Sequence, residues 1–278
     1  MLNHNEPMSK HCSLRAGGEA QDFFIPNTLN DLSHFLKNNQ KPILMLGLGS
    51  NLLVRDKGFA GVVIKLTQLN QLTIVNNIIQ AGAGVTLAKL SRFCQSQELN
   101  GAEFLSAIPG NIGGALAMNA GAFGSEFWSM VDSVATINTV GEVFKRDATE
   151  FDIAYRQVTP HHQNEYFIGS NLRLAPTDKQ QNIKALLKKR NDLQPIGLPS
   201  CGSVFKNPPN HHAAKLIQES NLKGFCIGNA CVSDKHANFI INQGKATASD
   251  IEHLIKHIQQ TVKSNFNIDL ETEVIIIG

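Results

Sequence analysis

The chain of 278 residues is long enough for two domains, and 42% hydrophobic with 17% charged residues is typical of a folded globular protein. A net charge of +2 without a basic run argues against nucleic-acid binding, and no apolar stretch is long enough to span a bilayer. The N-terminal segment lacks the apolar core of a signal peptide, and five scattered cysteines argue against a disulfide framework. We therefore expect a cytoplasmic protein in a reducing compartment.

Helical and strand patterns alternate along the first third of the chain. The segment "PNTLNDLSHFLKNNQ" predicts a helix, with Thr28 as N-cap and an acidic residue, Asp31, three positions later. The next predicted elements are a buried strand with a glycine turn, a hairpin around Asn76-Asn77 and a second helix. They lie in "KPILMLGLGSNLLV", "QLTIVNNIIQAGAGV" and "TLAKLSRFCQSQEL".

The rest of the chain continues this mixture. "VDSVATINTVGEVFKR" predicts a strand pair that turns near Gly141, and residues 179–193 predict a helix that ends before Pro195. The last helix, "ASDIEHLIKHIQQTVKSNF", has an apolar stripe and a capping box of Ser249 and Glu252, and a strand closes the chain in "IDLETEVIIIG". Strand pairs mixed with helices, without a βαβ repeat, predict an α+β fold.

The first glycine motif, "LGLGSNLLVRDKG", opens like a dinucleotide-binding fingerprint. Gly47 and Gly49 have the required spacing, but Leu52 stands at the third glycine position and no helical stripe follows. A Rossmann fold is therefore excluded. Two interpretations remain open for this strand end: a tight turn, or a backbone that approaches a phosphate group.

A second glycine-rich segment covers residues 101–126, "GAEFLSAIPGNIGGALAMNAGAFGSE". Five of its glycines from position 110 onward lie among small apolar residues, together with Asn119. Glycines at this density suit a second phosphate cradle, because they remove side chains where a ligand approaches. Close packing between backbone segments explains the same pattern, so both interpretations stay open here.

The motifs together resemble the UDP-N-acetylenolpyruvoylglucosamine reductase family, in its shorter type II form, from about Ser13 to the C-terminus. The resemblance rests on "SLRAGGEA", "GLGSNLLVRDKGFAGVVI", "IPGNIGGALAMNAGAFG", "AYRQ", "RNDLQP", "CGSVFKNP", "LKGFCIGNACVSDKHANFIIN" and "LETEVIIIG". It implies an FAD-binding fold of the PCMH or vanillyl-alcohol-oxidase type with a separate α+β substrate-binding domain. We expect one FAD-binding subdomain in 1–67 joined by the strand 267–278, a second in 68–178, and the substrate-binding domain in 196–266.

The resemblance also implies the reaction. NADPH would reduce FAD, and the reduced flavin would pass hydride to the enolpyruvyl group, giving UDP-N-acetylmuramate for peptidoglycan precursor synthesis. The enzyme would be an oxidoreductase, a UDP-N-acetylmuramate dehydrogenase. By the same resemblance, two segments line the FAD: Gly47, Gly49, Ser50, Asn51 and Leu52 in the first, and Ile108, Pro109, Gly110, Gly113, Gly114, Asn119 and Gly121 in the second.

Three residues match the catalytic set of the family. Ser203 in "CGSVFKNP" matches the proton donor, although a serine in a glycine-rich loop is ordinarily a turn cap. Arg156 in "AYRQ" matches the arginine that binds the substrate carboxylate, since its planar fork suits bidentate contact. Spacing alone does not distinguish Glu271 from Glu273, because both point to one face of a strand, and the resemblance selects Glu273.

The chain departs from the family pattern at one position, and its substrate contacts are assigned separately. Where the family has a serine two positions after the arginine, this chain has Val158, followed by Thr159. Cys226, Cys231 and His236 recur every fifth residue, but without a CxxC pair or fourth ligand we expect no metal site. The candidate substrate-binding residues are Tyr155, Lys206, Asn207, Lys235 and His236, and Asn238 in the same "SDKHANF" segment is a further candidate contact to the UDP-sugar.

Two other functions remain as alternatives. A flavin oxidase of the same fold would act on another hydroxy compound and would react rapidly with oxygen. A catalytically silent nucleotide-binding or scaffold protein would take up no flavin. For the favoured function we expect a monomer whose partners are a UDP-sugar and NADPH, with no nucleic acid and no membrane partner.

Overall fold

The structure, a computed structural model, describes residues 2–174 and 182–278. The chain forms two compact units. Among the described residues, unit 1 comprises residue 2 and residues 23–48, 63–174 and 182–190, and unit 2 comprises 3–22, 49–62 and 191–278. The predicted substrate-binding segment 196–266 therefore lies wholly in unit 2, together with the C-terminal strand.

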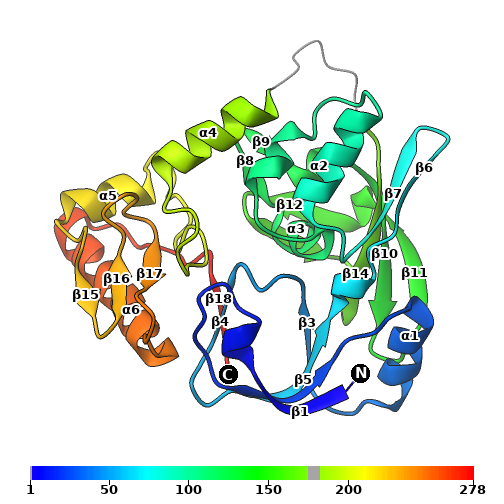
Figure 1. Ribbon diagram of the computed structural model, residues 1–278, viewed down its shortest axis with the longest axis horizontal. Coiled ribbons are helices and arrows are strands. Elements are labelled where there is room, and N and C mark those ends of the chain that lie inside the picture. Colours follow the sequence, from blue (N-terminus) through cyan, green and yellow to red (C-terminus); the bar gives the residue numbers. More distant parts are fainter. Residues whose placement is uncertain (1, 175–181) are drawn as a thin grey trace. The chain divides into compact units, whose positions relative to one another are not determined.

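Unit 1 is built on a five-stranded antiparallel sheet with the order β11-β10-β14-β7-β6 (Figure 1). Its strands are β6 (Leu72–Val75), β7 (Ile78–Gly82), β10 (Val131–Asn138), β11 (Val143–Asp147) and β14 (Glu165–Leu172). Asn76 and Asn77 form the two-residue turn between β6 and β7, and both have positive φ angles, 50° and 61°. This confirms the predicted hairpin, because asparagine tolerates the left-handed conformation that such a turn requires.

Helices and short 3-10 turns complete unit 1. The helices are α1 (Leu29–Asn38), α2 (Leu87–Ser96), α3 (Ile112–Met118) and α4 (Ile183–Leu193), of which residues 191–193 belong to unit 2. The 3-10 turns are Leu66–Gln68, Glu103–Ala107, Phe127–Met130 and Ala148–Glu150. Thr28 and Asp31 form a reciprocal capping box at α1, which confirms the predicted start of that helix. Of the predicted helix 179–193, residues 179–181 lie outside the described residues.

One hydrophobic core joins the helices of unit 1 to its sheet. Leu90 of α2, Leu116 of α3 and Val134 of β10 are fully buried in it. Trp128 packs against the rings of Phe151 and Phe167, and its indole nitrogen donates to the Leu116 carbonyl at 2.8 Å. A buried indole N–H that finds such an acceptor keeps the large ring in the core without an unpaired donor, so the C-terminal part of α3 is fixed to the sheet.

Two small hairpins extend unit 1 beyond the main sheet. They are formed by β8 (Gly121–Ala122) with β9 (Ser125–Glu126), and by β12 (Phe151–Ala154) with β13 (Gln157–Pro160).

A further four-stranded sheet has the order β1-β2-β5-β3. Its strands are β1 (Leu2–Pro7), β2 (Glu19–Phe24), β3 (Ile43–Leu46) and β5 (Phe59–Lys65), and a 3-10 turn, Met8–Lys10, follows β1.

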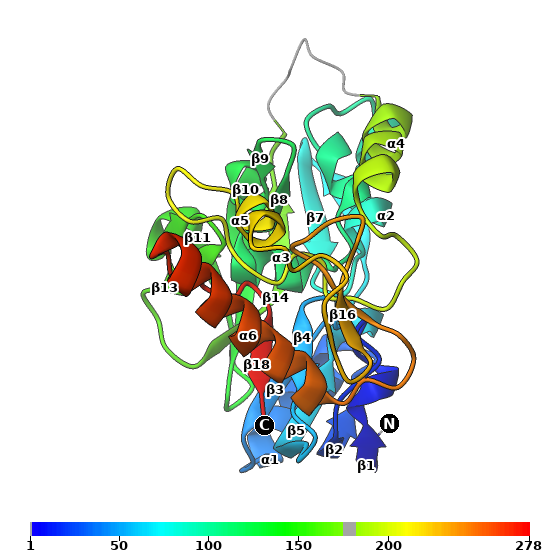
Figure 2. The same ribbon diagram turned by 90° about the vertical axis from the view of Figure 1, so that its left-hand side faces the viewer.

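Unit 2 contains a three-stranded antiparallel sheet (Figure 1) and two α-helices, which Figure 2 shows. The strands are β15 (Cys226–Ile227), β16 (Ala230–Val232) and β17 (Ile240–Asn242), and the helices are α5 (Ala213–Glu219) and α6 (Ala248–Phe266). A parallel pair joins β4 (Leu52–Val54) to β18 (Ile275–Ile277). The predicted apolar stripe of α6 is confirmed, since Ile251, Leu254, Ile255, Ile258 and Val262 are all buried.

The cap of α6 differs from the prediction. Thr247, not Ser249, is the N-cap, and it forms the capping box with Asp250. The amide of Ser249 instead donates to Asp56 Oδ2 at 2.9 Å. Thr247 and Ser249, two residues apart, each precede an acidic residue by three positions, so the spacing fits both pairs. The helix therefore begins two residues earlier than we expected. None of the helices in the described part of the chain is long and apolar enough to cross a membrane.

A disulfide links Cys226 to Cys231, which corrects the expectation from their scattered positions. The two-residue turn of Gly228 and Asn229 places the cysteines directly opposite each other in β15 and β16. Cross-strand partners approach closely enough for a disulfide wherever a hairpin register aligns two cysteines. Cys12, Cys94 and Cys201 are the other cysteines, and all three are buried thiols.

Reduction of this disulfide is expected to lower the free energy of unfolding by about 2 kcal/mol, because it closes a loop of only a few residues in the unfolded chain. Urea unfolding with and without a dithiol reductant, with thiol content checked by mass, would measure the difference. The double variant Cys226→Ser/Cys231→Ser is the control, since reductant should leave it unchanged. Equal unfolding midpoints for the oxidised and reduced wild type would contradict the prediction.

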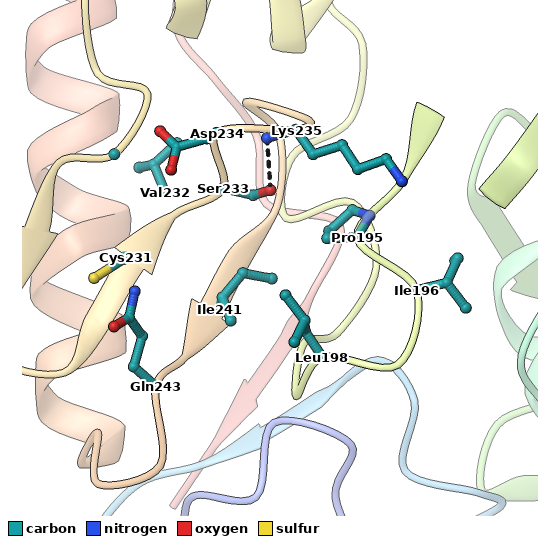
Figure 3. Close-up of a pocket in the computed structure, with 11 residues that line it drawn as sticks. Pro195, Ile196, Leu198, Cys231, Val232, Ser233, Asp234, Lys235, Ile241 and Gln243 are labelled. Atoms are coloured by element: carbon teal, nitrogen blue, oxygen red, sulfur yellow. Dashed lines mark hydrogen bonds between the residues drawn. The ribbon is translucent and has the colours of Figure 1, made fainter. Parts of the chain in front are cut away.

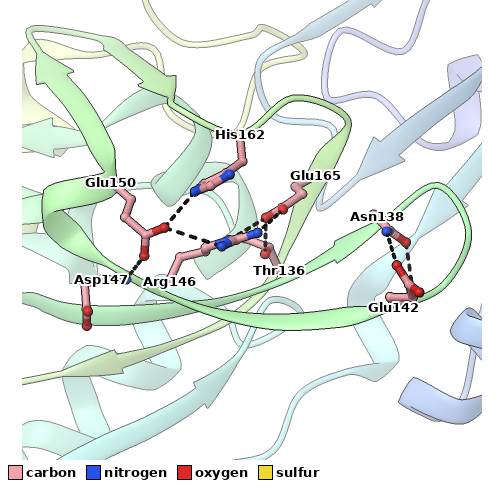
Figure 4. A network of polar contacts seen from close by, with 8 residues as sticks. All are labelled: Thr136, Asn138, Glu142, Arg146, Asp147, Glu150, His162 and Glu165. Atoms are coloured by element: carbon pink, nitrogen blue, oxygen red, sulfur yellow. Dashed lines mark hydrogen bonds and ion pairs between the residues drawn. The ribbon is translucent and has the colours of Figure 1, made fainter.

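A network of charged and polar side chains lies at the β11 edge of the unit 1 sheet (Figure 4). Arg146 contacts both carboxylate oxygens of Glu165, at 3.1 Å from Nε and 2.5 Å from Nη2, and Thr136 donates a hydroxyl to the same carboxylate. Glu150 contacts Arg146 at 3.4 Å and His162 at 2.7 Å. The hydrogen bond from Arg146 is the main reason why the pKa of Glu165 is lowered.

The substitution Glu165→Gln should therefore destabilise the protein at neutral pH but much less in acid. A carboxylate whose pKa is lowered by folding contributes stability above its unfolded pKa, near 4.5, and loses that contribution as the pH falls through the lower folded value. Thermal unfolding of both proteins at pH 7 and at several values below 4.5 would measure the gap. A gap that does not narrow in acid would show that packing, not charge, explains the loss.

Candidate active site

Arg156 lies at the tip of the hairpin formed by β12 and β13 in unit 1. Ala154 pairs with Gln157, so Tyr155 and Arg156 are the two turn residues. The φ angle of Arg156 is 56°, in the left-handed region that residues other than glycine and asparagine seldom adopt. Strained backbone of this kind is often found at functional sites, where the surrounding contacts maintain it.

The guanidinium of Arg156 is held by two backbone carbonyls. Nη1 donates to the Asn119 carbonyl at 3.1 Å, and Nη2 donates to the Gly121 carbonyl at 2.7 Å. Tyr155, which is half exposed, contributes a ring whose centroid lies 5.0 Å from the Arg156 guanidinium carbon. A guanidinium is planar and carries five N–H donors, a geometry that suits contact to a carboxylate.

Gly121 and Asn119 serve protein contacts in this region. A Cβ on Gly121 would lie 3.0 Å from Nη1 of Arg156 and 2.5 Å from the Ser125 carbonyl, so glycine is required for the close approach. The side chain of Asn119 is fully buried and donates to Glu126 Oε2 at 2.8 Å. Its role in cofactor binding stays a prediction.

Backbone amides of the "IPGNIGG" segment form hydrogen bonds within the protein. The amides of Ile112 and Gly113 donate to the carbonyls of Val85 and Ala83, both at 3.0 Å. A Cβ on Gly113 would touch the Ala83 methyl at 3.1 Å, whereas a Cβ on Gly114 would meet nothing within 4 Å. The two glycines therefore differ: Gly113 permits close packing, and Gly114 leaves open space where a ligand could approach.

Asn111 carries an acceptor that the protein leaves without a partner. The side chain is buried, and its Nδ2 donates to the Gly84 carbonyl at 2.6 Å, but Oδ1 accepts no hydrogen bond from any described residue. A Cβ on Gly47 would lie 2.9 Å from that Oδ1, so glycine is required there. A buried acceptor without a donor is unfavourable, and a flavin nucleotide offers hydroxyl and imide donors that fit it.

Sequence reasoning missed Asn111. The signal for it was present, because an asparagine follows Pro109-Gly110 at the start of a helix, where its side chain would ordinarily cap. The structure shows no such cap. Of its predicted neighbours, Ile108 is half-buried and Pro109 is exposed, while the Gly110 carbonyl accepts from the Leu87 amide at 3.0 Å.

In unit 2, the "CGSVFKNP" segment pairs with the "LETEV" segment. The carbonyl of Val204 accepts from the amides of Glu273, at 2.8 Å, and Val274, at 3.3 Å. Two successive amides that donate to one carbonyl form the pattern of a β-bulge, which turns a side chain away from the regular alternation. Ser203 directly precedes Val204, so the predicted proton donor and the predicted acid lie on paired segments of one compact unit.

The first glycine motif supports this pairing. Asn51 donates from Nδ2 to the Glu273 carbonyl at 2.8 Å, and its own carbonyl accepts from Ile275 at 3.1 Å. Leu52 pairs with Ile275 in β4 and β18, and Ser50 precedes that pair. Gly49 has a φ angle of 67°, and a Cβ there would lie 2.0 Å from the His11 carbonyl, so this position forms a tight turn.

The structure separates Glu271 from Glu273, which alternation alone did not. Glu271 is exposed and forms an ion pair with Lys206, with 2.6 Å between Oε1 and Nζ. Glu273 is half-buried, and its carboxylate interacts electrostatically with the thiol of Cys201. Burial, with a smaller contribution from that carboxylate, raises the pKa of the Cys201 thiol to about 12.

The "FKNP" residues are held by neighbours within unit 2. Asn207 accepts the amide of Ala213 at 3.0 Å, next to the start of α5. Asn238, which is buried, donates to the Phe205 carbonyl at 2.8 Å and accepts the Phe205 amide at 3.0 Å. Asn238 was expected to contact the UDP-sugar, and its clamp on Phe205 was not predicted, because a side chain that bonds a distant backbone has no local signature.

Lys235 and His236 lie close to a pocket in unit 2 (Figure 3). The pocket has a volume of about 390 Å³, and its lining residues are Pro195, Ile196, Leu198, Gly224, Cys231, Val232, Ser233, Asp234, Lys235, Ile241 and Gln243. The Lys235 ammonium donates to the Asn191 carbonyl. Burial lowers the pKa of His236 and so favours the neutral form of the ring. Figure 3 shows that polar and apolar side chains share the lining.

Two remaining predictions concern the arginine loop and metal binding. Val158 pairs with Ile153 and packs against the unit 1 core, and Thr159 accepts a long hydrogen bond of 3.4 Å from Gln157. Thr159 therefore offers only a weak local hydrogen bond near the position of the family serine. Within the described residues, no group of three His, Cys, Asp or Glu side chains is arranged to hold a metal ion.

Residues 23–146 match the family model of an FAD binding domain. With the orphaned acceptor of Asn111 and the open space at Gly114, this match defines the class of protein: an FAD-binding enzyme of mixed helix and strand content. Residues 194–277 match the model for the C-terminal domain of UDP-N-acetylenolpyruvoylglucosamine reductase.

Whole-chain comparisons give the family. Proteins named UDP-N-acetylenolpyruvoylglucosamine reductase from Nitrosomonas eutropha and Alkalilimnicola ehrlichii are each 48% identical over the whole chain, which covers 89% and 95% of their lengths. A crystal structure of that enzyme from Thermus caldophilus matches with a TM-score of 0.83 at 28% identity, covering 100% of this chain and 98% of the other. The chain belongs to the UDP-N-acetylenolpyruvoylglucosamine reductase family.

This membership confirms several predictions from the sequence. The α+β fold with an FAD-binding part and a separate C-terminal domain is confirmed, and so is the expectation of an oxidoreductase that uses FAD. Two features of unit 1 fit FAD: the open space beside Gly114 and the side-chain oxygen of Asn111 that lacks a hydrogen-bond donor.

Proposed function

We propose that the chain reduces UDP-N-acetylenolpyruvoylglucosamine to UDP-N-acetylmuramate with NADPH, in the cytoplasm, for peptidoglycan precursor synthesis. Support comes from the whole-length relatives that carry the reductase name. When bound, FAD would supply the two-electron chemistry, accepting hydride from NADPH and passing it to the methylene carbon of the enolpyruvyl group. The residues of the chain must then manage charge and one proton at the substrate.

Ser203 is the proposed proton donor. Hydride addition to the methylene carbon leaves negative charge on the adjacent carbon and its carboxylate, and the reaction is complete only when that carbon receives a proton. The Ser203 hydroxyl would donate this proton and recover one from solvent. A hydroxyl is a weak acid in water, so it serves only against a strongly basic carbanion in a supported site.

Arg156 and Glu273 are the proposed groups that hold the developing charge. Arg156 would form a bidentate contact with the substrate carboxylate, which is supported by the carbonyl contacts that orient its fork. Glu273, when protonated, would donate a hydrogen bond to the enolate-like oxygen. Donors aimed at charge that develops in the transition state stabilise it most, because they need no reorganisation during the reaction.

The observation that carries the proposal is the pairing of Val204 with Glu273. It brings the residue next to Ser203 and the selected carboxylate onto adjacent backbone segments, while Glu271 is occupied by Lys206. Contacts of Tyr155, Lys206, Asn207, Lys235 and His236 with the UDP-sugar are part of the proposal. The proposal also includes a monomeric state and a division into three parts. These are one FAD-binding subdomain in 1–67 with 267–278, a second in 68–178, and the substrate-binding domain in 196–266.

The test follows the flavin spectrum through two separate steps. The purified protein is reduced with NADPH without oxygen, and UDP-N-acetylenolpyruvoylglucosamine is then added. Return of the oxidised flavin band, with formation of UDP-N-acetylmuramate, would support the proposed reaction. A yellow protein that ignores the sugar and reoxidises in air would favour the oxidase, and a protein that takes up no flavin would favour the nucleotide-binding or scaffold alternative.

A further inference from the structure

Asn119 connects three segments of unit 1 around Arg156. It ends α3 in the left-handed conformation, with a φ angle of 44°, and its side chain is fully buried. Nδ2 donates to Glu126 Oε2 at 2.8 Å and to the Ala154 carbonyl at 3.2 Å, while Oδ1 accepts the Trp128 amide at 3.2 Å. Every polar atom of the side chain is therefore used inside the protein.

The contacts of Asn119 bear on Arg156 from two sides. Ala154, which Asn119 binds, ends β12 two residues before Arg156. The backbone carbonyl of Asn119 accepts from the Arg156 guanidinium at 3.1 Å, beside the contact from the Gly121 carbonyl. One residue thus fixes both the base of the hairpin turn and the end of the arginine side chain.

Arg156 requires such support. Its φ angle of 56° lies in a region that an arginine leaves readily when its neighbours do not maintain it. A long side chain with four rotatable bonds also loses conformational freedom when it is held in one orientation. Without fixed partners for the turn and the guanidinium, the fork would sample many directions, and few of them would suit a planar carboxylate.

We propose that Asn119 is a positioning residue for Arg156, which sets the direction of the guanidinium before a carboxylate substrate arrives. The inference rests on the proposed role of Arg156 in binding the substrate carboxylate. Asparagine suits the position because it tolerates the left-handed backbone and supplies two donors and an acceptor on one short side chain. An aspartate would instead place its carboxylate against the acceptors of Glu126 and Ala154.

The decisive experiment is a double-mutant cycle with Asn119→Gly and Arg156→Ala. Glycine keeps the left-handed backbone and removes only the side chain. Two quantities are measured: the rate at which the enolpyruvyl sugar reoxidises the reduced flavin, and the dissociation constant of the sugar from the oxidised holoenzyme, read from the change in flavin absorbance. The second readout does not depend on turnover.

Asn119→Gly is expected to weaken sugar binding and slow reoxidation by about 10–100-fold in the wild-type background, since small misplacement of a contact group is costly. In the Arg156→Ala background the same substitution should change either quantity by less than about twofold, because the group it positions is gone. Asn138→Gly is the matched control. Asn138 forms the same kind of bond to Glu142, at 2.8 Å, in another hairpin of unit 1 (Figure 4).

Four results would overturn the inference. Equal losses from Asn119→Gly in both backgrounds would indicate a general structural role, and so would an equal loss from Asn138→Gly. No loss at all would leave Arg156 positioned without Asn119. If Arg156→Ala itself has no effect, the proposed role of Arg156 fails, and this result is distinguishable because it needs only the single variant. Should Asn119→Gly fail to fold, Glu126→Ala removes one acceptor of Asn119 and should give a smaller loss with the same dependence on Arg156.

Discussion

Replacing Ser203 with alanine is expected to slow reoxidation of the flavin by the enolpyruvyl sugar about 10²–10⁴-fold, the usual range for the loss of a general acid. Flavin reduction by NADPH should stay near the wild-type rate, because no proton from Ser203 enters that step. The substitution should be tolerated structurally. Ser203 is only half-buried. Its neighbours are Gly202, where an added Cβ would meet no atom within 4 Å, and Val204, which is buried.

Anaerobic stopped-flow measurements of the two half-reactions would test this expectation. Ser200→Ala is the matched control, since Ser200 lies three residues earlier in the same loop and is also half-buried. It should leave both rates within about twofold of wild type, as expected for a small substitution away from the reacting atoms. If Ser203→Ala slows both half-reactions equally, then Ser203 supports the loop or the flavin site and is not the proton donor.

Replacing Glu273 with glutamine should lower the rate of sugar reduction by about 10²–10³-fold, as removal of one donor to a developing oxyanion does in other enzymes. Glutamine nearly preserves the volume and the backbone pairing with Val204. The amide N–H₂ is a weaker donor than a protonated carboxyl, so the transition state loses stabilisation while the fold remains. Single-turnover kinetics with the prereduced enzyme would isolate this step.

Glu271→Gln provides the comparison that the structure makes possible. It is the same chemical change two residues away, on an exposed side chain whose ion pair with Lys206 is solvent-accessible. Exposed ion pairs contribute little to stability, about 0–1 kcal/mol, so we expect only a small effect on the rate. If the two substitutions have similar effects, or if Glu271→Gln has the larger one, the assignment of Glu273 is wrong.

The motifs of the sequence were sufficient for the class of protein. "CGSVFKNP", "AYRQ" and "LETEV" indicated the family, which whole-length relatives then confirmed. Local elements were also predictable where a short stretch of chain determines them. The Thr28 cap, the Asn76-Asn77 turn and the apolar stripe of α6 all depend on residues within one or two turns of one another.

The features that tertiary structure decided depend on contacts between distant segments. The different environments of Glu271 and Glu273 follow from a segment some 70 residues earlier, which neither periodicity nor spacing describes. The disulfide of Cys226 and Cys231 required the exact hairpin register. Of the asparagines in the glycine-rich segment, only Asn119 was singled out from sequence, and Asn111 was missed.

The fold separated the two asparagines. Asn111 retains a buried oxygen without a donor, whereas Asn119 has every side-chain atom paired. Their residue type sets only how many hydrogen bonds each can form. Which of those bonds the protein itself satisfies, and which it leaves for a ligand, is determined by the segments that folding brings around each side chain.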